Sequence, residues 1–382
     1  MTFETLFTPL RIGARVAPNR IMLAPMSVCY GDADGYVTPA QLEHYGRRAQ
    51  GGAGVVVTEN FAVSTAGRQM PRQTLVASDT HLPGLSALAA EIKRHGALAL
   101  VQLVHAGRYA GPWDVYDQAR RLAPSAVPFE LTPGRVVTPQ EITEAEIEES
   151  IEAFAHAAWL CEQAGFDGVH VHAAQGFLIS EFFSPRMNHR TDRWGGDFAN
   201  RVRLAWEVVR AVRERTSPDF VLGVHLLVDE LMPGGWSVED AARLAPLLVE
   251  AGAQFLFPVP ATFEALRCEP NIGLFSRRGY GIDSTRAIKS TVDVPVVANG
   301  VLGDPHDAAA VLERGDADAI GLARPLFVDP DWPSKVAADE IGAIRTCPCD
   351  PPTCLRTQLT GAICDHWPPD AVERGHLGYQ HP

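Results

Sequence analysis

The sequence predicts an α/β fold, a (β/α)8 TIM barrel with a short cysteine-rich C-terminal extension, and three observations support it. Strand-like apolar runs alternate with segments of helical periodicity, which is typical of a parallel sheet or barrel. Eight such runs occur, the number that closes a barrel, and polar residues gather at the carboxyl ends of seven of them. The alternative, a doubly wound open sheet, is disfavoured because no Gly-x-Gly-x-x-Gly turn follows the first strand.

The expected elements alternate regularly along the chain. The strands are expected near 20–25, 54–59, 98–103, 167–172, 220–227, 254–258, 294–298 and 317–322. The helices are expected near 40–50, 82–95, 144–164, 198–215, 238–251, 283–290, 305–314 and 331–338. Gly51 and Gly252 follow two of these helices and support their stops.

Length and composition indicate one large domain followed by a tail. A chain of 382 residues with 46% hydrophobic content can bury a single barrel core, so we expect a barrel over 1–340 and a tail over 341–382. The formal net charge of −13 argues against nucleic acid and anionic membranes as partners, and favours small molecules or proteins. No signal peptide and no apolar run of about 20 residues is found, so we expect a cytoplasmic protein.

The stretch 166–201 places two histidines at the end of a strand. Val169 and Val171 alternate with His170 and His172, so both imidazoles lie on one face of the fourth expected strand. The strand then breaks into a polar and aromatic loop, which ends where Asp197 can cap the next helix. His172, at the strand end, is the candidate for a site, whereas His170 is more readily explained as an interior histidine.

The same stretch resembles the old yellow enzyme family of FMN-dependent oxidoreductases. The family pattern His-x-x-(His or Asn)-Gly-Tyr-Leu, Phe-x-Ser-Pro and Asn-x-Arg-Thr-Asp-x-x-Gly-Gly is matched from His172 to Gly196. Two positions differ, because Gln175 replaces His or Asn and Phe177 replaces Tyr. The resemblance covers roughly 3–340 and implies a barrel that binds FMN at its mouth.

Two turns near the C-terminus predict the phosphate site. Gly-containing turns after the seventh and eighth strands suit an anion, and one guanidinium adjoins them. The residues concerned are Asn299, Gly300, Gly321 and Arg324. In the resemblance this phosphate belongs to FMN.

The resemblance also assigns contacts to the flavin ring. Pro25, Met26 and Ser27 would lie against the ring, and Asn60 and Gln102 would bond its pyrimidine end. At the end of the fifth strand the family has an Arg that faces flavin N1 and O2. This chain has His225 there, which carries a positive charge only below its own pKa.

The resemblance implies hydride transfer through flavin N5, with NAD(P)H as electron donor and an organic substrate such as an enone. His172 and Gln175 would hold the polar end of the substrate. Phe177 has no proton to give, so Tyr30, Tyr109 or water would serve as the acid. The same geometry run oxidatively gives an amine dehydrogenase, demethylase or desaturase, and a flavin-binding barrel without turnover is a further alternative. A homo-oligomer is expected.

The tail carries a cluster of thiols: Cys347, Cys349, Cys354 and Cys364. Four thiolates suit a [4Fe–4S] cluster or structural zinc, and free thiols are the alternative. The 2,4-dienoyl-CoA reductase and trimethylamine dehydrogenase branch of the family carries such a cluster just after the barrel. The spacing here, Cys-x-Cys-x4-Cys-x9-Cys, differs from the spacing in that branch. A cluster would transfer electrons to a partner protein or serve structure alone.

Overall fold

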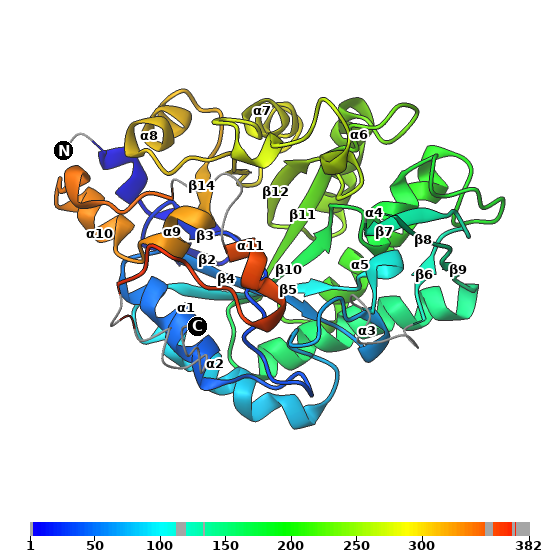
Figure 1. Ribbon diagram of the computed structural model, residues 1–382, viewed down its shortest axis with the longest axis horizontal. Coiled ribbons are helices and arrows are strands. Elements are labelled where there is room, and N and C mark those ends of the chain that lie inside the picture. Colours follow the sequence, from blue (N-terminus) through cyan, green and yellow to red (C-terminus); the bar gives the residue numbers. More distant parts are fainter. Residues whose placement is uncertain (1–2, 112–119, 133, 348–353, 369–370, 372–382) are drawn as a thin grey trace.

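The computed structural model describes residues 3–111, 120–132, 134–347, 354–368 and 371, and parallel strands form its centre. Eight strands hydrogen-bond in the order β12-β11-β10-β5-β4-β3-β14-β13. A parallel bridge between Leu256 and Val296 joins the two ends of this sheet, so the strands close into a barrel. Helices surround the barrel (Figure 1). The predicted (β/α)8 barrel is therefore confirmed.

All eight expected strands are present. They are β3 (Ile21–Leu23), β4 (Val55–Ala62), β5 (Leu98–Val104), β10 (Gly168–Ala173), β11 (Val221–Asp229), β12 (Phe255–Pro260), β13 (Val297–Ala298) and β14 (Ala319–Leu322). The expected helices correspond to α1 (Pro39–Gln50), α2 (Leu82–Lys93), α3 (Glu144–Gln163), α5 (Phe198–Arg215), α6 (Val238–Glu250), α7 (Ile282–Lys289), α8 (Pro305–Glu313) and α10 (Trp332–Ala337). Each expected boundary lies within a few residues of the observed one.

Local capping explains where several helices begin. Thr38 and Thr143 each form a capping box with the residue three positions later, at the starts of α1 and α3. Asp197 accepts a hydrogen bond from the Asn200 N–H and caps α5 as expected. These caps fix the loops that precede the helices, and one of those loops carries the family motif.

A hairpin closes the amino-terminal end of the barrel. Strands β1 (Leu10–Ile12) and β2 (Arg15–Ala17) pair antiparallel. Leu10 and Ile12 pack with the inward side chains of the barrel strands, including Phe255. The polar side chains of the barrel interior therefore lie toward the opposite, carboxyl-terminal end.

Several short elements around the mouth were not predicted individually. They are α4 (Leu178–Phe183), α9 (Arg324–Val328), β6 (Leu122–Ala123), β9 (Gln140–Glu141), the hairpin of β7 (Phe129–Thr132) and β8 (Arg135–Val137), and α11 (Cys354–Thr357). None of the helices in the described part of the chain combines the length and apolar character that a bilayer crossing requires.

The C-terminal segment lies across the barrel mouth, where it is drawn in orange to red in Figure 1. The Ala362 N–H donates to the Val28 carbonyl at 2.9 Å, and the Gln358 amide donates to the Ser27 carbonyl at 2.8 Å. Trp367 donates through Nε1 to the Phe327 carbonyl at 2.6 Å. The segment therefore fastens the loop after β3 to α9.

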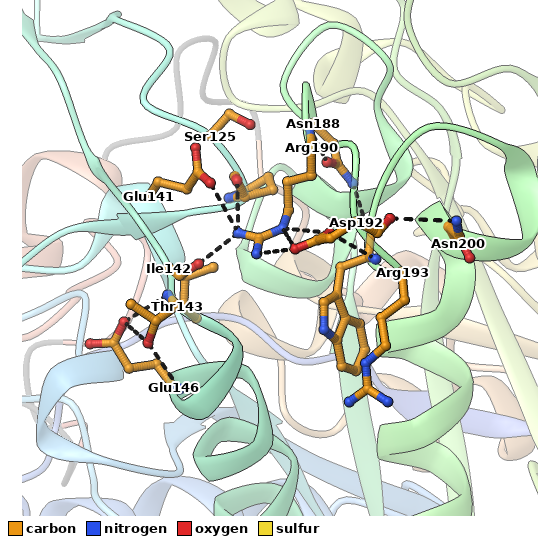
Figure 2. A network of polar contacts seen from close by, with 12 residues as sticks. Ser125, Glu141, Ile142, Thr143, Glu146, Asn188, Arg190, Asp192, Arg193 and Asn200 are labelled. Carbon is orange, nitrogen blue, oxygen red and sulfur yellow. Dashed lines mark hydrogen bonds and ion pairs between the residues drawn. The ribbon is translucent and has the colours of Figure 1, made fainter.

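An arginine clamp holds the long loop of the family motif (Figure 2). The Arg190 guanidinium donates to the Ile142 carbonyl at 2.6 Å and the Pro124 carbonyl at 3.3 Å, and it pairs with Asp192. Asn188 donates to two further carbonyls, those of Phe182 and Trp194. The most specific part of the motif therefore shapes the loop, and its side chains bond protein atoms.

Candidate active site at the carboxyl ends of the strands

Three histidines stack inside the barrel near its mouth. The ring centroids of His172 and His225 lie 4.8 Å apart, with planes inclined by 20°. Those of His170 and His225 lie 5.3 Å apart at 9°. The Gln102 Nε2 lies 2.9 Å from His225 Nδ1 and 3.3 Å from His170 Nδ1. The structure thus brings together Gln102, His172 and His225, which three different strands contribute.

Burial keeps these imidazoles neutral. Burial lowers the pKa of His225 to about 3. Burial, and then the neighbouring His225 and His170, lower the pKa of His172 well below its ordinary value, although a hydrogen bond with Gln175 opposes the shift. Burial and His225 likewise lower the pKa of His170. At neutral pH the stack therefore offers neutral donors and acceptors.

The Gln102 contact fixes the tautomer of His225. An amide nitrogen only donates, so Nδ1 of His225 accepts and its proton sits on Nε2. This Nε2 is buried and has no hydrogen-bond partner among the described residues. The Asn299 Oδ1 at the end of β13 is also buried and unpartnered in the described chain. Unmet buried polar atoms are costly, so a donor and an acceptor at this mouth fit a polar ligand such as FMN.

A second polar corner follows β3 and β4. The Ser27 hydroxyl donates to Asn60 Oδ1 at 3.1 Å, and Gln73 donates to the Asn60 carbonyl at 2.7 Å. Pro25, Met26 and Ser27 are only half-buried. This corner therefore presents hydroxyl and amide groups near the mouth, as the predicted flavin contacts require.

The buried carboxylate of Glu59 holds the loop that follows Ser27 in place. Its carboxylate accepts the backbone N–H groups of Val28 at 2.8 Å and Cys29 at 2.7 Å, and Cys29 has a positive φ of 55°. Burial raises the pKa of Glu59 to about 7, against the lowering effect of these hydrogen bonds. Sequence reasoning missed this role of Glu59, because its hydrogen-bond partners come from the loop after the neighbouring strand β3.

The predicted phosphate residues lie at or just after the carboxyl ends of the adjacent strands β13 and β14. Gly300 has a φ of +126°, a conformation that favours glycine, whereas an added Cβ at Gly321 would lie 2.5 Å from the Phe257 ring. The half-buried Arg324 begins α9 and donates to the Phe275 carbonyl in the loop after β12. The structure therefore gathers Asn299, Gly300, Gly321 and Arg324 on one side of the mouth.

Aromatic side chains form the opposite side. The rings of His172 and Phe177 meet edge to face at 4.7 Å, and Phe177 also contacts Tyr109 and Phe263. Gln175 holds a positive φ of 59° on the turn between these residues. The Phe177 ring takes the place of a hydroxyl donor beside His172.

Tyr30, predicted as a proton donor, contacts the C-terminal segment in the structure. Its hydroxyl donates to the Ala362 carbonyl of the C-terminal segment, and its ring meets His44 on α1 edge to face. The hydroxyl proton is thus engaged with the tail, so the prediction that Tyr30 supplies a catalytic proton finds no support in this arrangement.

A buried charged network behind the turn was missed. Arg108 and Glu181 are both fully buried and pair at 3.2 Å, while Arg186 joins Glu230 at 2.6 Å and Glu264 at 2.9 Å. Burial raises the pKa of Glu181 to about 8, although Arg108 opposes the shift. Sequence reasoning missed this network because Glu181 and Glu264, the partners of Arg108, lie 73 and 156 positions away from it.

Three tail cysteines gather beneath the C-terminal segment. Burial first, and then the adjacent Cys347 and Cys364, raise the pKa of Cys354 to about 11. Among the described residues no group of three or more side chains is arranged to hold a metal ion, and Cys349 lies outside that range. The residues that the structure describes do not by themselves form the expected cluster site.

Comparisons with known proteins support the resemblance. The model of the NADH:flavin oxidoreductase / NADH oxidase family matches residues 5–340. An NADH oxidase of Thermoanaerobacter brockii is 33% identical over 346 residues, 90% of this chain and 52% of the relative. An NADPH dehydrogenase of Geobacillus sp. (strain WCH70) is 36% identical over 343 residues, 88% of this chain and 94% of the relative. The solved complex of 2-naphthoyl-CoA reductase with 2-naphthoyl-CoA has a TM-score of 0.91 at 28% identity, covering 97% of this chain and 58% of that one.

The closed parallel barrel and the polar groups at its mouth therefore define a barrel of the FMN-dependent oxidoreductase class. This chain belongs to the NADH:flavin oxidoreductase / NADH oxidase family, the family of the old yellow enzymes. The chain spans about half the length of some relatives, including the NADH oxidase at 52%.

Proposed function

We propose that this protein uses FMN and NAD(P)H to reduce an activated carbon–carbon double bond in a small organic substrate, such as an enone. The observation that carries the proposal is the set of unmet polar atoms at the mouth of a barrel of this family, above all His225 Nε2 and Asn299 Oδ1. The NADPH dehydrogenase relative, which this chain covers over 94% of its length, supports the choice of a nicotinamide as electron donor.

Each side of the mouth has a distinct part in this proposal. FMN, when bound, supplies the atom that accepts and returns the hydride. Ser27, Asn60 and Gln102 would bond the flavin ring, while Gly300 and Arg324 would hold the phosphate. His172 and Gln175 would donate hydrogen bonds to the substrate carbonyl and so stabilise charge that develops on its oxygen.

The oxidative direction is a second candidate, and Phe177 favours it. Reduction of a double bond requires a proton donor at the substrate carbon, and the phenyl ring of Phe177 has none. An amine dehydrogenase, demethylase or desaturase transfers hydride from substrate to flavin without such a donor. In the reductive direction, Tyr109 or water would supply the proton.

We also propose the division of the chain into the barrel, 1–340, and the tail, 341–382, and the family match ending at residue 340 supports it. The tail would hold a [4Fe–4S] cluster or zinc only if Cys349 completes a set with Cys347, Cys354 and Cys364. A homo-oligomer and an electron-transfer partner remain proposals of the same kind.

Cofactor analysis of anaerobically purified protein tests the function. We expect yellow protein that releases about one FMN per chain on denaturation and consumes NADH or NADPH with an enone. The iron, sulfide and zinc contents of the same sample show whether the tail holds an iron–sulfur cluster, zinc or neither. Turnover with cyclic amines but not enones would favour the oxidative direction, and colourless protein that takes up no added FMN would end the proposal.

Two substitutions at opposite sides of the mouth should have opposite effects. His172→Ala removes one donor to the substrate, so we expect ligand binding or transition-state stabilisation to weaken by about 1–3 kcal/mol with FMN content unchanged. Arg324→Ala removes the guanidinium at the phosphate and should shed FMN while the fold persists. Equilibrium dialysis for FMN and kcat/KM per bound flavin measure both. Loss of FMN from the His172 variant, with ligand affinity per flavin intact, would contradict the assignment of this strand end to substrate.

A further inference from the structure

His225 is a buried hydrogen-bond donor near the mouth, and its Nε2 has no partner in the part of the chain that the structure describes. Its side chain leaves β11 between β10 and β12, and it is 6% exposed. Gln102 holds Nδ1, so the Nε2–H is the free group. A cofactor bound at this mouth would supply the missing hydrogen-bond acceptor by placing one against Nε2.

Among the residues that the structure describes, none beside His225 carries a fixed charge that could balance an anion. The groups that face it are His170 and His172 on β10, Gln102 on β5 and Phe257 on β12. Burial alone lowers its pKa, to about 3, with no charged residue of the described chain contributing. A ligand that becomes negatively charged here would therefore find histidine as the nearest group able to gain a positive charge.

Flavin reduction creates such a charge. A hydride carries two electrons and one proton, so its transfer from NAD(P)H to neutral FMN releases NAD(P)⁺ and leaves one negative charge on the flavin. A charge of this kind within a few ångströms in a low-dielectric site raises the proton affinity of an imidazole strongly. A guanidinium in the same place would be charged in both redox states.

We propose that His225 takes up one proton from solvent when a bound flavin is reduced. His225 would then carry a positive charge only while the flavin carries the negative charge of its reduced state. The new N–H bond forms at Nδ1, and the site returns to zero net charge. Nδ1 then needs an acceptor, which Gln102 provides when its amide rotates and presents Oε1, while His170 loses the Gln102 donor and carries its own proton on Nδ1 in place of Nε2. Gln102 is therefore the positioning residue for this step. The inference rests on the proposed binding of FMN.

Nitrogen-15 NMR of the full-length, FMN-loaded protein labelled at histidine tests the proposal. Spectra of the oxidised and dithionite-reduced protein are compared from pH 5.5 to 8, and His225→Gln identifies the signal of His225 by its loss. We expect one protonated nitrogen in the oxidised state throughout this range and two in the reduced state at pH 5.5, which from a pKa of about 3 requires a rise in proton affinity of at least about 1,000-fold. A His225 signal that stays neutral in both states throughout this range would overturn the inference.

Two further variants keep the test decisive. His225→Arg serves for the assignment if His225→Gln loses its flavin. Gln102→Glu places a carboxylate beside Nδ1, so His225 should be protonated already in the oxidised protein and gain nothing on reduction. A protein that binds no FMN would end the proposed function, whereas FMN-loaded protein with a neutral His225 in both states would end this inference alone.

Discussion

Between pH 6.5 and 5 the protein is expected to lose most of its stability. Five buried histidines of the described chain have a lowered pKa: His44, His105, His170, His172 and His225. The pKa of His105 falls to about 4 and that of His225 to about 3, both through burial. Below pH 6.5 the unfolded chain binds protons at these sites and the folded chain does not, so acid favours unfolding.

Two buried carboxyl groups have the opposite effect on the pH dependence of stability. The pKa of Glu59 is raised to about 7 and that of Glu181 to about 8, so the folded chain binds two protons that the unfolded chain releases above its ordinary pKa of 4.5. The net excess of protons on the unfolded state therefore grows as the pH falls below 6.5 and reaches about three near pH 5. At about 1.4 kcal/mol per proton and pH unit, stability should fall by about 4 kcal/mol per unit. Above pH 7 the carboxyl groups reverse the slope, so maximum stability is expected near pH 6.5–7.

Denaturant unfolding of oxidised, FMN-loaded protein at several pH values measures this slope. His44→Phe is the informative variant, because His44 Nδ1 is buried with no hydrogen-bond partner within the described ranges and the ring packs against Tyr30, Tyr45 and Phe327. Its slope should be smaller by about 1.4 kcal/mol per pH unit. His189→Gln, at an exposed position, is the matched control and should keep the wild-type slope. Equal slopes in the His44 variant and wild type would contradict the account.

Arg48→Met should unfold the protein far more readily than Arg47→Met, although the two residues are neighbours on α1. Arg48 is fully buried and donates to the carbonyls of Leu326 at 3.1 Å and Phe327 at 2.9 Å, at the end of α9. Its loss removes the side-chain donor to the buried Leu326 carbonyl and leaves the Phe327 carbonyl with Trp367 as its side-chain donor, which should cost about 3–5 kcal/mol. Arg47 pairs with Asp331 where both side chains are partly exposed, so its loss should cost about 1 kcal/mol or less.

The same pair of variants should differ in cofactor retention. Arg48 fixes the end of the short helix whose first residue is Arg324, so Arg48→Met should weaken FMN binding as well as the fold. Urea midpoints and FMN dissociation constants measured side by side give both effects. If the Arg48 and Arg47 variants proved equally stable, the carbonyl contacts would have no such importance.

Periodicity and strand-end polarity predict the barrel because both are local. Alternation places Val169 and Val171 outward and His172 inward, and closure of the barrel then brings His172 beside His225. The partners of a buried charge are not local, so Arg48 with α9 and Arg108 with Glu181 were beyond sequence reasoning. The engagement of Tyr30 with Ala362 was missed for the same reason, since 332 positions separate them. The motif predicted the family from residues, such as Arg190, that shape a loop.

The contacts of Arg190 have a consequence for how the barrel mouth of this protein can be altered. Arg190 grips the excursion between β5 and α3 through the carbonyls of Pro124 and Ile142, and every amino acid offers a carbonyl. The hairpin between those anchor points, which brings Phe129 against Tyr109, can therefore change its side chains without loosening its attachment. The hairpin can therefore be replaced as a unit while its attachment to the barrel is kept. Grafting the hairpin of a relative between residues 124 and 142 is a direct way to alter what the mouth admits while the scaffold stays constant.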